Sequence, residues 1–260
     1  MALTTIGLMA LLGCFTGFMA GLLGIGGGMI ITPFLIMLIP SSLIPHEHIV
    51  HVAIATSLAT IAFTSLSSVR AHHKRGAVLW NVVASVAPGI LVGAVVGAQI
   101  AGWLPTFWLS LIFAAFVGFS AFKMFLNKSP RPDRNLPGTI GKFFMGIAIG
   151  ILSALVGAGG GFISVPWMIW CNVKMQNAVA TSAAFGFPIA LFGTIGYIIS
   201  GWNVSGLPPW PIDLGYICIP ALFSVAITSV LFAPLGAKVA HSIDTKPLKK
   251  IFACLLCFVC

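Results

Sequence analysis

The chain has 260 residues, of which 59% are hydrophobic and only 7% are charged, and its formal net charge is +9. Because soluble domains carry about 25% charged residues, this composition excludes a soluble fold and indicates a polytopic membrane protein. The basic charge does not indicate nucleic-acid binding, since the Lys and Arg residues lie in short loops between apolar runs and no long polar, aromatic stretch accompanies them.

Ten apolar runs follow one another along the chain. A membrane-spanning helix needs about 20 apolar residues, and the runs 26–40 and 159–171 are too short to cross alone. The last run, 248–260, also stops before it could cross, so the final helix is expected to be incomplete. The remaining runs cover residues 4–23, 50–69, 80–102, 106–126, 140–157, 177–199 and 212–235.

Each short run overlaps or follows a cluster of glycines, here called the first glycine knot (Gly24–Gly28) and the second glycine knot (Gly157–Gly161). The segments that end in them read Gly-Leu-Leu-Gly-Ile-Gly-Gly-Gly and Ala-Leu-Val-Gly-Ala-Gly-Gly-Gly. Each glycine lowers helix propensity by about 1 kcal/mol, so consecutive glycines predict an unwound turn. Irregular backbone is tolerated within a membrane only inside the protein. Helices broken at matching places in two halves are typical of transporter binding sites.

Two other glycine series have a simpler interpretation. Glycines at four-residue spacing on a membrane helix allow a second helix to approach closely. We expect such packing along two helices, whose series are Gly13, Gly17 and Gly21, and Gly89, Gly93 and Gly97.

The Lys and Arg residues gather in alternate loops, which predicts the orientation of the chain. The loops that contain them are expected in the cytoplasm, and the loops without them, together with the N-terminus, outside. The hairpin 4–40 then starts and ends outside, and the hairpin 140–171 starts and ends inside. The basic residues occupy the segments 70–75, 123–142, 174 and 238–250, whereas the loops 41–49, 103–105 and 200–213 contain none.

We therefore predict an all-α polytopic membrane protein made of two inverted repeats, each a glycine-broken helical hairpin followed by three transmembrane helices. Residues 1–126 form the first repeat, residues 127–139 a cytoplasmic linker, and residues 140–260 the second repeat. A shared Ala-Thr-Ser block supports the repeat, at residues 51–57 in the first copy and 176–182 in the second.

The acidic residues indicate the charge of a ligand. A cation inside the membrane would normally meet a carboxylate, and the predicted spans contain none. An unwound turn that restarts a helix instead presents N–H donors and the positive end of a dipole, which favours an anion. The knots are not nucleotide loops, because they lack the third glycine of a dinucleotide motif and the lysine of a phosphate-binding loop. The acids, all in predicted loops, are Glu47, Asp133, Asp213 and Asp244.

The candidate substrate-binding groups are the backbone amides of the knots and the hydroxyls of the Ala-Thr-Ser blocks. The hydroxyls have an alternative role, because Ser and Thr in membrane helices often bond back to their own turn. The full set comprises Gly26, Gly27, Gly28, Thr56, Ser57, Gly159, Gly160, Gly161, Thr181 and Ser182.

His51 begins the first Ala-Thr-Ser block, where Gln176 stands in the second. Its charge changes near neutral pH, so it is a candidate proton-linked group; the alternative is an interfacial histidine. We expect no metal and no other cofactor. The loop 46–48 offers two histidines and a glutamate without a fourth ligand, and the cysteines of 254–260 have no His or carboxylate nearby.

The paired knots, each followed by a proline and then by an Ala-Thr-Ser block, resemble the TauE/SafE sulfite exporter family of the toluene-sulfonate uptake permease group. The resemblance extends over nearly the whole chain. It implies a multi-pass secondary transporter of the bacterial inner membrane. Such a transporter would export small sulfur oxyanions, such as sulfite or sulfoacetate-like organosulfonates, by alternating access.

Several alternatives stay open. The carrier could move another small anion, or couple uptake of sulfur compounds to protons. An intramembrane enzyme would need a nucleophile, base or metal within the membrane, and only hydroxyls, cysteines and His51 are available. A scaffold without transport activity would have no need of two broken hairpins. The sequence is compatible with a homodimer.

Overall fold

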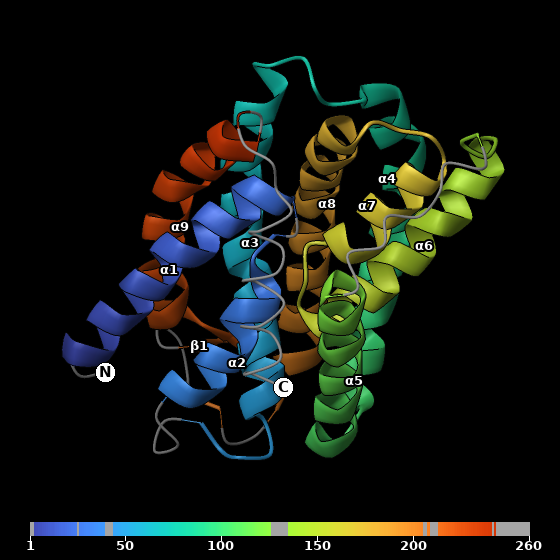
Figure 1. Cartoon of the computed structure of the whole chain (residues 1–260). Coiled ribbons are helices and arrows are strands. Elements are labelled where there is room, and N and C mark those ends of the chain that lie inside the picture. Colours follow the sequence, from blue (N-terminus) through green and yellow to red (C-terminus); the bar gives the residue numbers. More distant parts are fainter. Residues whose placement is uncertain are drawn as a thin grey trace.

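The computed structural model describes residues 3–24, 26–39, 44–125, 135–204, 207–208, 213–240 and 242. Within them nine α-helices follow one another (Figure 1), and six are long and apolar enough to cross a membrane. The all-α polytopic class is thereby confirmed, and the predicted run 248–260 lies outside the described residues. The helices are α1 (Leu3–Leu23), α2 (Gly28–Leu38), α3 (Ile49–His73), α4 (Trp80–Trp103), α5 (Thr106–Phe125), α6 (Thr139–Val156), α7 (Gly161–Trp170), α8 (Met175–Gly201) and α9 (Ile219–Ala240).

Both glycine knots separate a long helix from a short one. α2 has 11 residues and α7 has 10, which at 1.5 Å per residue is roughly half of the ~30 Å hydrocarbon core. After the knot the chain reverses, so that each short helix runs back toward the end of the molecule from which the preceding long helix started (Figure 1). The hairpins α1–α2 and α6–α7 open toward opposite ends of the molecule (Figure 1).

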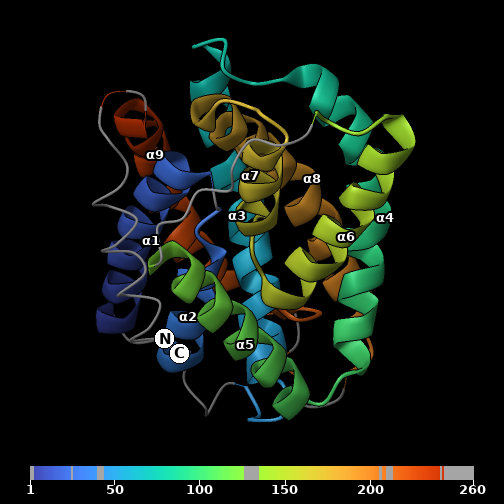
Figure 2. The same cartoon turned by 45° about the vertical axis from the view of Figure 1, so that its right-hand side comes forward.

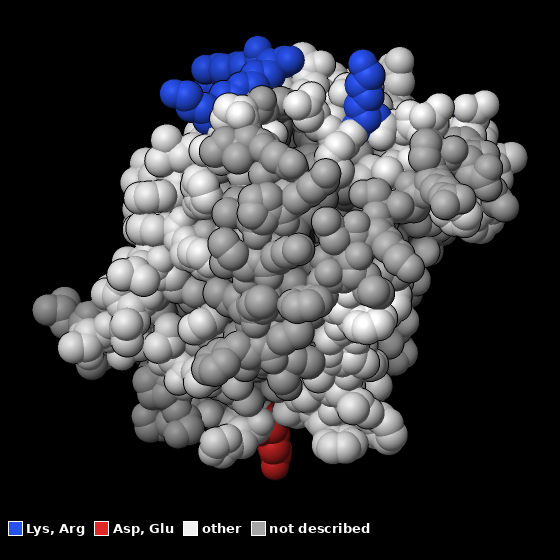
Figure 3. All heavy atoms as spheres, in the orientation of Figure 1, with Lys and Arg blue, Asp and Glu red and all other residues white. Residues whose placement is uncertain are grey.

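The charged residues distinguish these two ends (Figure 3). Arg70 lies in the last turn of α3, Lys174 immediately precedes α8 and Lys238 lies in the last turn of α9. This end, which also carries Lys74 and Arg75, is called the basic end. The opposite end carries Glu47, just before α3, and is called the Glu47 end.

The helices of the two sequence halves are interleaved. α1 packs along α9, and α4 packs along α6; α3 also contacts α9, and α8 also contacts α4. In Figure 2, α1 and α9 lie on one side and α4 and α6 on the other, with α3, α7 and α8 between them. We call α1, α2, α3 and α9 the first bundle, and α4, α6, α7 and α8 the second bundle. Each bundle contains three helices from one half of the chain and one from the other.

The division at residues 127–139 stays a prediction, because residues 126–134 lie outside the described part of the chain. The packing across the halves shows, however, that neither half is a body by itself. α3 and α8 meet at the centre of the molecule, so the contact between them also joins the two bundles.

The glycine series of α1 and α4 pack as predicted. A Cβ on Gly17 would overlap the carbonyl oxygen of Ser229 in α9, and a Cβ on Gly93 would overlap that of Ile147 in α6. Small residues let the helix backbones touch, which is how membrane helices gain contact area without a hydrophobic driving force. These series therefore hold each bundle together.

A short β-hairpin before α9 was not predicted. β1 (Asp213–Leu214) pairs antiparallel with β2 (Ile217–Cys218). Gly215 forms the turn with φ 59°, and a Cβ there would lie 2.6 Å from the carbonyl oxygen of Ile198 in α8. The sequence did not separate this hairpin from α9 because strand and helix together read as one apolar run.

Candidate functional site at the glycine knots

The tips of the two hairpins touch in the interior of the protein. A Cβ on Gly26 would lie 2.8 Å from the Cα of Gly159, so the two backbones approach as closely as only glycines permit. Gly27 and Gly160 have φ values of 73° and 76°, in the left-handed region that glycine adopts without a steric penalty. The glycine clusters thus interrupt both helices, as predicted, and bring the interruptions together.

Two helix N-termini converge where the knots meet. α2 begins at Gly28 and α7 at Gly161, each with a left-handed glycine as its N-cap. The amides of Gly160, Gly161 and Phe162 donate to no acceptor among the described residues. Unpaired N–H groups of the second knot and the positive ends of two helix dipoles therefore lie close to one another.

Ser57 and Ser182 each hold the knot of the opposite half. Ser57 Oγ donates to the carbonyl oxygen of Gly157 at 3.1 Å, and also lies 3.4 Å from that of Gly28. Ser182 Oγ donates to the carbonyl oxygen of Gly24 at 2.9 Å and accepts from Ser164 Oγ at 2.8 Å. Both bonds to the opposite knot cross from one bundle to the other, so we call them the serine latches.

Thr56 and Thr181 lie on a different side of their helices. Thr56 Oγ1 accepts a hydrogen bond from the backbone N–H of Cys218, and Thr181 Oγ1 accepts one from that of Leu79, both at 3.0 Å. Cys218 immediately precedes α9 and Leu79 precedes α4. The two threonines therefore anchor the start of another helix of their own bundle, α9 for Thr56 and α4 for Thr181, and their role as ligands of a substrate stays a prediction.

His51 lies near the Glu47 end, six residues before Ser57 in α3. Its Nε2 is 3.1 Å from the carbonyl oxygen of Ala101 and 3.0 Å from that of Leu104. Since a carbonyl oxygen only accepts, Nε2 carries a proton and donates. The ring also stacks on Tyr216 at a centroid distance of 5.1 Å. These contacts attach α3 to the end of α4, and proton coupling through His51 stays a prediction.

A small cavity adjoins the knots on the side of the basic end. Its volume is about 10 Å³, which is room for roughly one water molecule. Ser65 and Ser68 of α3 line it and were not predicted from the sequence. They follow Ser57 at helical spacing, and this one-sided series of serines is the signal that would have revealed them. The other lining residues are Ala20, Gly24, Gly26, Gly159, Ala183 and Gly186.

The residues considered as possible metal ligands, at 46–48 and 254–260, add nothing to the site at the knots. Among the described residues, no three His, Cys, Asp or Glu side chains gather into a possible metal site. The cysteines at 254–260 lie outside the described residues.

Comparison with known proteins gives one consistent result. The family model described as "Sulfite exporter TauE/SafE" matches residues 9–260. A "Probable membrane transporter protein" of Haemophilus influenzae is 34% identical over 257 residues, which cover 98% of this chain and 97% of the relative. The Bacillus subtilis protein YdhB, with the same description, is 30% identical over 72% of this chain and 76% of its own length. No solved structure matches the chain significantly.

Proposed function

Because the chain belongs to the TauE/SafE sulfite exporter family, we propose that this membrane transporter exports a small sulfur-containing oxyanion, such as sulfite or an organosulfonate. The observation that carries the proposal is the meeting of two interrupted helices, with their N-termini converging, at Gly26 and Gly159. Half-helix N-termini at the membrane midplane are a recurrent way of binding anionic groups in secondary transporters.

The available donors match the energetic need of an anion. Removing an ion from water costs several kcal/mol, and each hydrogen bond to a charged group returns about 1.5–3 kcal/mol, so three or four donors are required. The amides of Gly160, Gly161 and Phe162 and the hydroxyls of Ser57 and Ser182 supply five. Glu47, the acidic residue whose side chain the structure describes, lies just before α3 and ten residues before Ser57.

Substrate movement would follow from a displacement of the first bundle relative to the second. The serine latches cross this boundary, whereas the bonds of Thr56 and Thr181 stay within one bundle. Separating the bundles would release the hydroxyls of Ser57 and Ser182 from carbonyl oxygens and make them available to the anion. The moving bodies in this proposal are the interleaved bundles and not the two halves of the sequence.

The orientation follows from the charges. The positive-inside rule places the basic end in the cytoplasm, which puts the N-terminus and Glu47 outside. In this orientation the two hairpins form an inverted repeat, one opening outward and one inward. A bacterial inner membrane is the location that the family resemblance implies.

The test is a ligand panel on the purified protein in detergent. Sulfite, thiosulfate, sulfoacetate and taurine are added at rising concentration and the unfolding temperature is recorded, because stabilisation grows with ligand concentration over the dissociation constant. We expect sulfite or sulfoacetate to stabilise the protein, and chloride at equal ionic strength to have no effect. The proposal fails if no sulfur oxyanion stabilises the protein and none is transported by proteoliposomes that contain it.

A further inference from the structure

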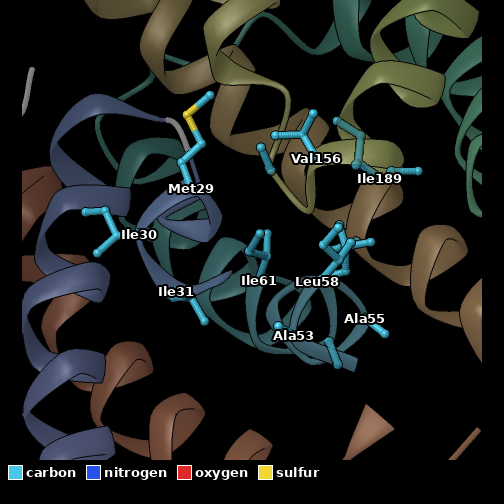
Figure 4. Packing of buried hydrophobic residues seen from close by; sticks show 14 of the residues in the cluster. Met29, Ile30, Ile31, Ala53, Ala55, Leu58, Ile61, Val156 and Ile189 are labelled. Atoms are coloured by element: carbon cyan, nitrogen blue, oxygen red, sulfur yellow. The ribbon is translucent and has the colours of Figure 1, made fainter. Parts of the chain in front are cut away.

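Different side chains occupy the two sides of the place where the glycine knots meet. Continuing the match between the Ala-Thr-Ser blocks along the two helices, Leu58 and Ile61 of α3 correspond to Ala183 and Gly186 of α8. Leu58 and Ile61 are fully buried and project from one face of α3 into the space between Met29 and Val156 (Figure 4). On the other side, Ala183 and Gly186 leave the cavity described above.

Ile61 and Leu58 close the side toward the Glu47 end by direct contact. The Cδ1 atom of Ile61 would lie 2.6 Å from a Cβ on Gly28, and that of Leu58 lies 3.1 Å from the Cβ position of Gly193. The side chains of Leu58 and Ile61 therefore occupy the space between α3, α8 and the first glycine knot. The corresponding space toward the basic end contains hydroxyls, since Ser65 and Ser68 stand where α8 has Ala190 and Gly193.

Ser68 is the unusual side chain of the cavity. It is only 2% exposed, and its hydroxyl has no hydrogen-bond partner within the part of the chain that the structure describes. Buried hydroxyls normally have one. Among the described residues Thr32, Ser153 and Thr194 share this property, but none of these three lines the cavity, and the two serines next to Ser68 on α3 do have partners. Ser67 donates to the carbonyl oxygen of Val230, and Ser65 donates to that of Ala62 at 3.2 Å. Ser68 Oγ thus offers an unused donor in a cavity that adjoins both knots.

The charge of the neighbouring surface suits an anion. Ser68 lies one helical turn or less from Arg70 and two turns from Arg75, at the basic end of α3. Lys174 precedes the helix that forms the opposite wall of the cavity. A cluster of positive charges at the basic end raises the local concentration of anions near the cavity.

We propose that the cavity between α3 and α8 is the passage through which the anion moves between the knots and the basic end, with Ser68 as a binding residue and Leu58 and Ile61 as the closure of the opposite side. This inference rests on the proposed function and deepens it. At about 10 Å³ the cavity admits a water molecule but not sulfite, so passage requires it to widen. Gly24, on its wall, is held by the latch from Ser182, so release of that latch widens the passage.

The first test measures sulfite binding to Ser68→Ala. Loss of one hydrogen bond to an anion should weaken the affinity by about tenfold or more, while Ser68→Thr, which keeps the hydroxyl, should restore part of it. Ser67→Ala is the matched control on the adjacent position, because its hydroxyl bonds to α9 and does not line the cavity. Equal affinities for wild type, Ser68→Ala and Ser67→Ala would overturn the role of Ser68 and leave the proposed function intact.

The second test needs no ligand. In a background from which the native cysteines have been removed and which retains transport, Ser68→Cys and Ala190→Cys, the latter at the position in α8 that corresponds to Ser65, are exposed to a membrane-impermeant thiol reagent in vesicles of either orientation. We expect labelling of Cys at position 68 from the basic side and none at position 190 from the other side. The reverse pattern, or labelling of neither, would overturn the passage. Absence of anion binding by the wild-type protein would overturn the proposed function and the passage together.

Discussion

α3 and α8 carry the same Ala-Thr-Ser block and cross at the centre of the protein, yet they differ within the next two turns. Where they agree, they make equivalent bonds: Ser57 and Ser182 hold the opposite knots, and Thr56 and Thr181 anchor the starts of α9 and α4. Where they differ, one side of the knots is filled by aliphatic side chains and the other holds a cavity with hydroxyls.

This comparison separates the parts of the site that must be alike from those that need not be. A carrier that alternates between two faces needs equivalent latches, because each must open in turn. In the proposed mechanism, the side chains beside the knots determine which face of the membrane the site can reach, so they need not be the same on the two sides. The predictions below test the shared parts and the unshared parts separately.

The largest effect is expected from the shared knots. Gly27→Val and Gly160→Val place a β-branched residue at φ 73° and 76°, which costs about 1–3 kcal/mol in backbone strain. A Cβ would also lie 2.9 Å from the carbonyl oxygen of Thr16 or 2.5 Å from Ile189 Cδ1. The strained turn should displace the amides of the knot, and each lost hydrogen bond to the anion costs about 1.5–3 kcal/mol, so flux in proteoliposomes should fall by roughly 100-fold in either variant.

Gly7→Val is the control for these variants, because a Cβ on Gly7 meets nothing within 4 Å. It lies in α1 and should transport like the wild type. Size-exclusion chromatography establishes that each variant inserts and folds. Wild-type flux in folded Gly27→Val or Gly160→Val would show that the amides of the knots do not hold the substrate.

The next effect comes from making the two sides of the knots alike. The double variant Ala183→Leu, Gly186→Ile gives α8 the side chains that α3 has at Leu58 and Ile61. It should fill the cavity and lower flux by about tenfold or more, with overpacking costing about 1–3 kcal/mol of stability. Flux is compared with that of Ala184→Leu, a neighbouring position of similar 5% exposure outside the cavity lining. Equal flux in both would contradict a passage between α3 and α8.

A moderate effect is expected from the latches. Ser57→Ala and Ser182→Ala each remove a bond worth about 0.5–1.5 kcal/mol, which lowers the unfolding temperature by roughly 2–4 °C per kcal/mol in a protein of this size. Because both hydroxyls are proposed ligands, sulfite affinity should also fall by about tenfold in each variant. A loss in only one of them would show that the two latches are not equivalent.

Thr56→Val and Thr181→Val are matched to the latch variants. Thr56→Val leaves the buried backbone N–H of Cys218 without its Thr56 acceptor, at a cost of about 1–3 kcal/mol. Thr181→Val does the same to the half-buried N–H of Leu79, so its cost should be smaller. We expect a lower unfolding temperature and an unchanged dissociation constant for sulfite. A weaker affinity with normal stability would instead support the threonines as ligands of the substrate.

The smallest effect is expected at His51, where the two halves differ naturally. His51→Gln introduces the residue found at position 176 and keeps an N–H donor for the carbonyl oxygens of Ala101 and Leu104. If His51 only attaches α3 to α4, flux should change by about twofold or less and keep its pH dependence, since only one hydrogen bond is altered. Loss of the pH dependence of flux in this variant would support proton coupling through His51.

Much of the architecture could be read from hydropathy and glycine spacing. The predicted run 50–69 corresponds to α3 and the run 80–102 to α4, each with similar bounds, because a membrane helix must satisfy its own backbone and so has a local signature. The interruption at Gly26–Gly28 and the close packing of Gly17 were predictable for the same reason. The β-hairpin at 213–218 was not, since two strands of two residues each leave no periodicity.

The sequence by itself determined that the protein lies in a membrane, that two helices break at glycines, and that the predicted spans offer no acid to a cation. These properties depend on composition and on neighbours within one helical turn. Only the tertiary structure decided that the bundles interleave, and that serines hold the opposite knots while threonines anchor helices. It also decided that Ser68 lines a cavity on one side of the knots, whereas Leu58 and Ile61 fill the corresponding space on the other side. Those outcomes depend on which helix faces meet across 100 or more residues of chain, as Ser57 and Gly157 do, and no local pattern encodes such a pairing.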